Sequence, residues 1–179
     1  MSGKIQTKLN ILILGIIIIV FSIVTVLIAI IPENETPNHR IAPNFSALTT
    51  DGSKYTLSND IGKKLIIIDF MATWCNPCLE IGKIYNQTLT DNPETLTIVS
   101  ITIEKLDTAA FLESWRLAWD FDWNFIPYGN YTQNIVKEYK IDIGIPASFF
   151  IDLKGIIRVS HLGLLSQKTV DNWLNGIYS

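Results

Sequence analysis

The hydrophobic pattern begins with an apolar segment near the start of the chain, followed by a longer stretch in which hydrophobic positions recur at strand or helix spacing. Residues 11–31 contain no charged side chain. A helix of this length spans roughly 30 Å, the thickness of a bilayer core. The run also exceeds the hydrophobic region of a typical signal peptide, which is about 7–15 residues. The pattern therefore predicts a transmembrane anchor at 11–31, with a cleaved signal peptide or a buried core helix as alternatives.

The charges on either side of this segment predict its orientation. Lys4 and Lys8 precede it, whereas Glu33 and Glu35 follow it. Because basic residues stay on the cytoplasmic side, we expect the N-terminus inside the cell and the rest outside. The predicted organisation is a cytoplasmic N-terminus at 1–10, the anchor at 11–31, a proline-punctuated linker at 32–40 and one extracytoplasmic domain at 41–179.

The pattern in 41–179 predicts an α/β domain. Continuous apolar runs rich in β-branched residues indicate buried strands, and apolar positions three to four residues apart indicate helices. Asp107 or Thr108 is expected to cap one helix and Ser166 the last. The predicted elements are a hairpin of 44–48 and 55–57, strands at 65–70, 96–103, 148–152 and 156–160, and helices at 76–89, 107–119, 133–139 and 166–177. This order favours a central β-sheet with helices on both faces.

The charge balance excludes one class of partner. The part of the chain after Ile31 carries 12 basic and 17 acidic residues, because two of the 14 basic residues precede the anchor. Its net charge is therefore about −5, and the basic residues form no cluster. We expect no binding to nucleic acid.

The two cysteines of the chain are close neighbours, Cys75 and Cys78, within Trp74-Cys75-Asn76-Pro77-Cys78. This spacing beside a strand and a helix is typical of a thioredoxin-like redox motif. A permanent structural disulfide is one alternative, although a bridge that closes so small a loop stabilises little. Half of a zinc site is another, but it would need two further ligands. The sequence offers two histidines for them, His39 and His161.

The position of each cysteine predicts its role. Cys75 is expected to lie partly exposed at the N-terminus of a helix, where free N–H groups and the helix dipole favour a thiolate nucleophile. Cys78, one turn further along, would be shielded and would resolve the mixed disulfide. Asn76 and Pro77 form the active-site loop between them. Proline is tolerated here because the first turn of a helix needs no backbone N–H from this residue.

Asp69 is the most informative residue outside the cysteine motif. It lies within the apolar strand at 65–70, where an unpaired carboxylate is costly. Burial would raise its pKa and make it a proton acceptor for Cys78. The alternative is a solvated aspartate at an exposed strand end.

These features together resemble a known fold. The WCxxC motif between a buried strand and a helix, with Gly144-Ile145-Pro146 directly before another strand, resembles the thioredoxin fold. The segments 42–45, 51–52, 56–58 and 69–75 more closely resemble the membrane-anchored, extracytoplasmic TlpA/ResA-like branch. The resemblance covers about 41–179 and implies a mixed central sheet with helices on both faces and an N-terminal β-hairpin.

The resemblance also implies roles for further residues. Pro146 matches the cis-proline of the family, and Ile145 would then offer its backbone to a substrate chain in strand-like pairing. Trp74 would shield the reactive cysteine and contact partners. The acidic residue that thioredoxins use as proton acceptor matches Asp69. An ordinary trans proline and a merely packing tryptophan are the alternatives.

Two positions depart from the TlpA/ResA-like pattern. That branch usually carries glutamate three residues after the second cysteine and proline two further on; here Ile81 and Lys83 stand there. Glu80 comes one residue early and should face another side of the helix. Met71 also replaces a frequent aromatic residue.

The predicted function is a membrane-anchored thiol–disulfide oxidoreductase that reduces disulfides of exported proteins, with a role in cytochrome c maturation implied by the resemblance. Its partners would be protein thiols or disulfides outside the cytoplasm and a membrane electron donor or acceptor, and it would need no cofactor beyond the Cys75–Cys78 pair. A dithiol oxidase is the nearest alternative.

Three other functions fit less well. A peroxidase would need Thr or Ser and Pro at the positions held by Ala72 and Ile68. A copper metallochaperone would need CxxxC with a partnering histidine. A non-enzymatic tethered scaffold would use the aromatic residues between the predicted strands at 96–103 and 148–152, which include Trp119, Phe121, Trp123 and Phe125.

Overall fold

The computed structural model describes residues 13–15, 17, 20–22, 40–141 and 144–178. The chain divides into two units, Met1–Pro37 and Asn38–Ser179. In the first unit, residues 13–15 and 20–22 are helical. Within the described part of the chain, no helix has both the length and the apolarity needed to cross a membrane. Most of the predicted anchor and of the linker, and the whole predicted cytoplasmic N-terminus, lie outside the described residues.

The second unit contains the α/β domain that the sequence predicts. A strand hairpin and a short 3-10 helix come first, and the strands and helices of the main layer structure follow. The elements are β1 (Ser46–Leu48), β2 (Lys54–Thr56), η1 (Leu57–Asn59), β3 (Leu65–Met71), α2 (Asn76–Asp91), β4 (Leu96–Thr102), α3 (Ala109–Ala118), β5 (Asn124–Ile126), α4 (Asn130–Tyr139), β6 (Ala147–Ile151), β7 (Ile157–Leu162) and α5 (Gln167–Tyr178).

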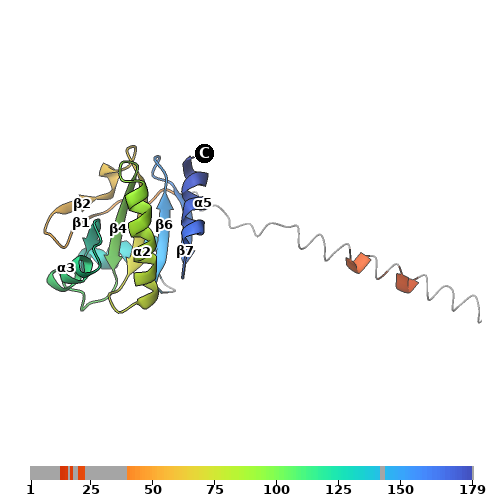
Figure 1. Ribbon diagram of the computed structural model, residues 1–179, viewed down its shortest axis with the longest axis horizontal. Helices are drawn as coiled ribbons and strands as arrows, with labels where there is room; N and C mark the ends of the chain where they lie inside the picture. The colour runs from red at the N-terminus through yellow and green to blue at the C-terminus, as the bar shows by residue number, and fades with distance from the viewer. Residues whose placement is uncertain (1–12, 16, 18–19, 23–39, 142–143, 179) are drawn as a thin grey trace, which may run out of the picture. The chain divides into compact units, whose positions relative to one another are not determined.

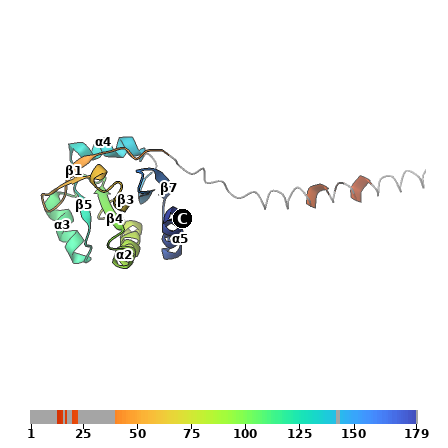
Figure 2. The same ribbon diagram turned by 90° about the horizontal axis from the view of Figure 1, so that it is seen from above.

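Five strands form one mixed sheet in the order β5-β4-β3-β6-β7 (Figure 1). β4 runs parallel to β3, whereas β6 and β7 are antiparallel to their neighbours. Helices α2, α3 and α5 cover one face and α4 covers the other, as the view from above shows (Figure 2). The predicted thioredoxin fold, with helices on both faces of a mixed sheet, is confirmed.

β3 occupies the centre of the sheet because its sequence is apolar on both faces. All seven of its residues are buried, as expected for a strand between two helical layers. Ile66, Ile68 and Phe70 pack in the core on the α4 side, and Ile67 packs beneath α2 and α5. The carboxyl end of this strand leads directly into the cysteine motif, so the best-buried strand of the domain positions the redox pair.

The predicted N-terminal hairpin is confirmed by antiparallel pairing of β1 with β2, in which Ala47 lies opposite Tyr55. Helix α4 begins at Asn130, three residues before the predicted start. β5 is missing from the prediction because it is only three residues long and lies in a loop dense in aromatic residues. It nevertheless extends the sheet beside β4, through pairing of Phe125 with Ser100.

The aromatic residues around β5 form part of the core on the α2 face. Phe121 and Phe125 are buried and Trp123 is half-buried, whereas Trp119 is 41% exposed. The Phe121 and Trp123 rings stack with centroids 4.6 Å apart. A Cβ atom added to Gly82 of α2 would lie 2.8 Å from the Phe121 ring, so glycine lets α2 approach this cluster closely.

Candidate active site

The two cysteines form a disulfide at the N-terminus of α2, with their Cα atoms 5.2 Å apart. Cys75 is the N-cap residue, and its sulfur accepts a hydrogen bond from the backbone N–H of Cys78 at 3.2 Å. Pro77 stands in the first turn, where a missing N–H costs nothing. The predicted helix-terminal position of the pair is therefore confirmed. An N–H donor directed at the Cys75 sulfur favours a thiolate there after reduction.

Both cysteines are nevertheless buried, and the expectation that Cys75 is partly exposed is wrong for the disulfide form. Cys75 is 4% exposed and Cys78 is 2% exposed. Tertiary packing buries them, because the pair lies in an apolar cluster to which the end of β3, helix α3 and the loop before β5 all contribute. Its other buried members are Met71, Ala72, Leu112, Phe121 and Phe125.

The cis-proline loop lies against this cluster. The Ile145–Pro146 peptide bond is cis, as predicted, and half-buried Ile145 packs on the cluster that contains the cysteines. Pro146 accepts a hydrogen bond from the N–H of Gly163, which ties the loop to the end of β7. The structure thus brings Ile145 and Pro146 next to a disulfide about 70 residues away in sequence.

Trp74 presents the largest exposed aromatic surface beside the disulfide. Its side chain is 64% exposed, and its indole N–H donates to the Glu104 carboxylate at 2.8 Å. The pKa of Glu104 is lowered by the backbone N–H of Leu106 first and by this indole second. Because the contact fixes the ring without burying it, Trp74 remains available to a partner. Sequence reasoning did not identify Glu104.

A buried carboxylate holds the loop that leads into the motif. Asp107 is 1% exposed and accepts hydrogen bonds from the Thr73 backbone N–H at 3.0 Å, the Thr73 hydroxyl at 2.5 Å and the Thr102 hydroxyl at 2.6 Å. Thr108, not Asp107, caps α3 by accepting from the N–H of Phe111. Asp107 therefore fixes the backbone two residues before Cys75.

Replacement of Asp107 by alanine is expected to lower the free energy of unfolding by about 2–4 kcal/mol, because three donors would lose their buried acceptor. Urea denaturation of the oxidised protein measures the effect. The exposed Asp171, which accepts from Gln167 within α5, is the control, and its alanine variant should change stability by less than about 0.5 kcal/mol. Equal effects of the two substitutions would contradict a clamping role for Asp107.

Asp69 lies beneath α2 in the middle of the sheet. It is 3% exposed, so the alternative of a solvated carboxylate at a strand end is wrong. Burial raises its pKa from 3.8 to about 7, against a smaller lowering by a hydrogen bond from Ser100. On the same face of β3, Ile67 packs with Tyr85 and Met71 packs with Cys78. Asp69 lies between these two positions, under the turn of α2 that begins at Cys78.

Two further residues complete the surroundings of Asp69. The Ser100 hydroxyl lies 3.2 Å from Oδ2 of Asp69 and accepts the indole N–H of Trp123 at 2.9 Å. Oδ1 of Asp69 is buried and has no hydrogen-bond partner among the described atoms. Sequence reasoning missed Ser100, and it considered Trp123 only among the aromatic residues of a tethered scaffold. A buried serine between Val99 and Ile101, in a strand rich in β-branched residues, was the available signal.

The departures from the TlpA/ResA-like pattern have a structural counterpart on α2. Ile81, at the position of the family glutamate, is fully buried against the sheet. Glu80 faces solvent instead and pairs with Lys83 at 2.7 Å, which confirms that it lies on another side of the helix. The buried acid near the cysteines therefore comes from β3 rather than from α2.

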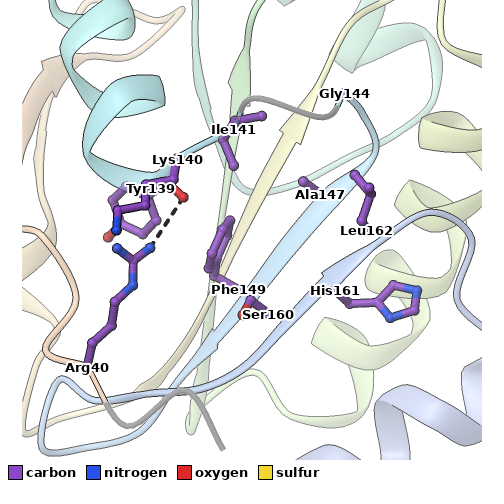
Figure 3. Close-up of a pocket in the computed structure, with 10 residues that line it drawn as sticks. All are labelled: Arg40, Tyr139, Lys140, Ile141, Gly144, Ala147, Phe149, Ser160, His161 and Leu162. Atoms are coloured by element: carbon purple, nitrogen blue, oxygen red, sulfur yellow. Dashed lines mark hydrogen bonds between the residues drawn. The ribbon is translucent and has the colours of Figure 1, made fainter. Parts of the chain in front are cut away.

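An open groove of about 370 Å³ begins beside the cis-proline loop, between the end of α4 and strands β6 and β7 (Figure 3). Ala147 and Phe149 form part of its floor. Arg40 donates to the carbonyl groups of Glu138 and Tyr139 at the end of α4. His161 points away from the groove in Figure 3, and its ring packs on Trp173 of α5.

Within the described ranges, no three side chains of His, Cys, Asp or Glu are placed to hold a metal ion. His39 lies outside those ranges. The ring nitrogen of His161 is 3.1 Å from the Leu164 carbonyl oxygen.

Comparisons with known proteins agree with this site. The model of the AhpC/TSA family matches residues 39–160. Thioredoxin-like protein YneN of Bacillus subtilis is 25% identical over 75% of this chain and 76% of its own length. Thiol-disulfide oxidoreductase ResA of the same organism is 24% identical over 75% and 72%. Among solved structures, the thioredoxin domain of a thiol-disulfide oxidoreductase from Bacteroides vulgatus superposes with a TM-score of 0.67 at 16% identity, covering 78% of this chain and 97% of that one.

The structural likeness concerns the fold, whereas the family match covers more than half of the chain, including the cysteine motif and the cis-proline loop. The relatives are thiol–disulfide oxidoreductases, and the disulfide at the start of α2 is the group that such chemistry requires. The chain therefore belongs to the AhpC/TSA family and is a thioredoxin-like thiol–disulfide oxidoreductase.

Proposed function

We propose that this oxidoreductase works as a reductant of protein disulfides outside the cytoplasm, with Cys75 as nucleophile, Cys78 as resolving thiol and Asp69 as proton acceptor. The observation that carries the proposal is the placement of Asp69, a buried carboxyl group with a pKa of about 7, beneath the turn of α2 that holds Cys78. An acceptor with this pKa is matched to deprotonation of a thiol near neutral pH.

The surroundings of the pair support the direction of electron flow. A strong oxidant has a stabilised dithiol form, whereas a reductant has a more stable disulfide. Here the side chains that pack on both sulfurs are apolar, which disfavours a thiolate. The Asp69 carboxyl below α2 and Glu104 beside Trp74 also oppose a further negative charge. The disulfide is thus the favoured state, and the protein donates electrons.

The reaction proceeds by two exchanges at sulfur. The Cys75 thiolate attacks a substrate disulfide, and the departing substrate sulfur takes a proton from water. Cys78 then passes its proton to Asp69 and attacks the Cys75 sulfur, which reforms the Cys75–Cys78 bond and releases the second substrate thiol. Ile145 and Pro146 would hold the substrate backbone, and Trp74 would contact its apolar side chains.

The cellular setting of the proposal rests on the sequence. A transmembrane anchor at 11–31 would place the domain outside the cytoplasm, where a membrane electron donor must reduce the disulfide again. The TlpA/ResA-like resemblance suggests a role in cytochrome c maturation. The substrates there would be oxidised Cys-x-x-Cys-His segments, to which haem is attached.

The test is the reduction potential of the domain, measured by equilibration with glutathione, together with the rates at which it reduces insulin and an oxidised Cys-x-x-Cys-His peptide. We expect a potential between about −230 and −300 mV and turnover of both substrates. Faster turnover of the peptide would support the cytochrome c role. Absence of insulin turnover would rule out a general reductase.

A dithiol oxidase is the second candidate, because the N–H of Cys78 points at the Cys75 sulfur and stabilises its thiolate. That effect, if dominant, would raise the potential above about −150 mV. In that case the reduced domain would form readily, and the oxidised domain would introduce disulfides into unfolded substrates.

A further inference from the structure

The two oxygens of the Asp69 carboxyl group lie in different environments. Oδ2 lies 3.2 Å from the Ser100 hydroxyl, across the pair of strands β3 and β4. Oδ1 is fully buried without a hydrogen-bond partner among the described atoms. Burial of an unsatisfied carboxyl oxygen is unfavourable, and in a native protein it calls for a functional explanation.

The directions of the hydrogen bonds around Ser100 follow from chemistry. The indole N–H of Trp123 can only donate, so the Ser100 oxygen accepts it at 2.9 Å. The single hydroxyl proton of Ser100 is then directed to Oδ2 of Asp69. If Trp123 were not a donor, the hydroxyl could rotate and serve other partners.

The Trp123 indole, which donates the first hydrogen bond in the series that leads to Asp69, is held rigidly. The Trp123 ring stacks on Phe121 and Phe125, with centroids 4.6 Å and 5.4 Å apart. Phe121 in turn closely approaches Gly82 of α2, on the helix that carries Cys78. Because the ring cannot turn without disturbing this stack, the N–H direction is fixed by packing.

We propose that Ser100 and Trp123 are positioning residues, which keep Oδ2 of Asp69 as a hydrogen-bond acceptor so that the proton of the inner thiol enters at Oδ1. The inference rests on the proposed role of Asp69 as proton acceptor. A proton on Oδ2 would point at the proton that the Ser100 hydroxyl donates, and the two protons would repel each other. A proton on Oδ1 meets no such repulsion, because no donor in the described part of the chain points at that oxygen.

The groups that face Asp69 come from three elements. α2 contributes the hydroxyl of Tyr85, whose pKa is raised by burial and by Asp69 itself, and Cys78, which packs with Met71 on the same face of β3. β6 contributes Ser148, which lies opposite Asp69 and accepts from Tyr85 at 2.7 Å. β4 contributes Ser100. Tyr85 and the two serine hydroxyls keep their protons at neutral pH, so the Cys78 thiol is the donor that Asp69 serves.

The proton step balances without a further reactant. The S–H bond of Cys78 breaks and the proton moves to Oδ1, which leaves Asp69 neutral. The Cys78 sulfur bonds to the Cys75 sulfur, and the Cys75–substrate bond breaks with its electron pair on the substrate sulfur. Water supplies the proton that the substrate takes and later accepts the proton that Asp69 holds.

The experiment compares Ser100→Ala, Trp123→Phe and the control Trp115→Phe by carbon-13 NMR titration of the Asp69 carboxyl group. Trp115 packs on Phe121 and Phe125 in the same aromatic cluster, so the control alters the cluster and leaves the indole that contacts Ser100 intact. Loss of the Ser100 donor should raise the titration midpoint of Asp69 by about one pH unit. Trp123→Phe should raise it by less, and Trp115→Phe should leave it unchanged.

A kinetic readout tests the same step. The pH midpoint for the rate of mixed-disulfide resolution should move upward in Ser100→Ala and, by less, in Trp123→Phe, in step with the Asp69 titration of each variant. In an Asp69→Asn background, neither substitution should move the pH profile. This coupling distinguishes positioning of Asp69 from a general loss of stability.

The failures of the two proposals are distinguishable. If wild-type Asp69 titrates near 7 and neither variant moves it, the inference about Ser100 and Trp123 is wrong while the proposed function stands. If wild-type Asp69 titrates near its ordinary value of about 4, both the acceptor role and this inference are wrong. The NMR measurement requires no turnover, so it remains informative if insulin reduction fails.

Discussion

Replacement of Cys75 by serine is expected to reduce the rate of insulin reduction by at least about a thousandfold, because the remaining thiol, Cys78, lies behind the first turn of α2 and has no second thiol to resolve an adduct. Cys78→Ser should abolish turnover equally but leave the first exchange intact. The two variants therefore lose the same activity at different steps, and together they assign the roles of the two sulfurs.

The distinguishing measurement is mass spectrometry after incubation with an excess of a disulfide-bonded peptide. Cys78→Ser should accumulate a covalent adduct through Cys75, since the resolving thiol is missing. Cys75→Ser should form little adduct, because Cys78 lies within α2, one turn behind the N-cap position that Cys75 occupies. Adduct formation by Cys75→Ser alone would reverse the assignment of nucleophile and resolving thiol.

The stability of the oxidised protein should fall as the pH rises from about 4 to about 7, because of Asp69. The folded-state pKa of this carboxyl group is raised from 3.8 to about 7. Between these values the unfolded chain has lost the proton and the folded chain retains it, so a rise in pH favours unfolding. At about 1.4 kcal/mol per pH unit, the loss amounts to about 4 kcal/mol across this window.

Asp69→Asn removes the titrating group while it keeps the shape of the side chain. The variant should match the wild type near pH 4 and exceed its free energy of unfolding by up to about 4 kcal/mol at pH 8. Its resolution of the mixed disulfide should slow by about tenfold or more at neutral pH. A variant that gains stability and loses rate is typical of a strained catalytic position.

Urea denaturation of the disulfide-bonded protein at a series of pH values measures this effect, with Asp171→Asn on the exposed surface of α5 as the control. Parallel curves for the wild type and Asp69→Asn would show that Asp69 has an ordinary pKa. The control should follow the wild type at every pH, because Asp171 lies exposed on α5 and its replacement leaves Asp69 in place.

Local sequence signals predicted most of the fold correctly. The β-branched run of β3, the helix after Cys75 and the Ser166 cap of α5, which accepts from the N–H of Thr169, each depend on residues close together in the chain. The strand β5 was not predicted, because three residues carry too little pattern and its pairing with β4 provides the evidence for it.

Within the candidate site, residue type and short-range spacing in the sequence by themselves determined the redox pair, its place at a helix terminus and the burial of Asp69. The cis-proline was predicted from the resemblance to the thioredoxin fold. The tertiary structure alone revealed the burial of Cys75, the clamp of Asp107 on Thr73 and the donor chain from Trp123 through Ser100 to Asp69. These last contacts join residues 34, 23 and 31 positions apart. Such contacts depend on how strands and loops pack against one another, and no local pattern in the chain encodes that packing.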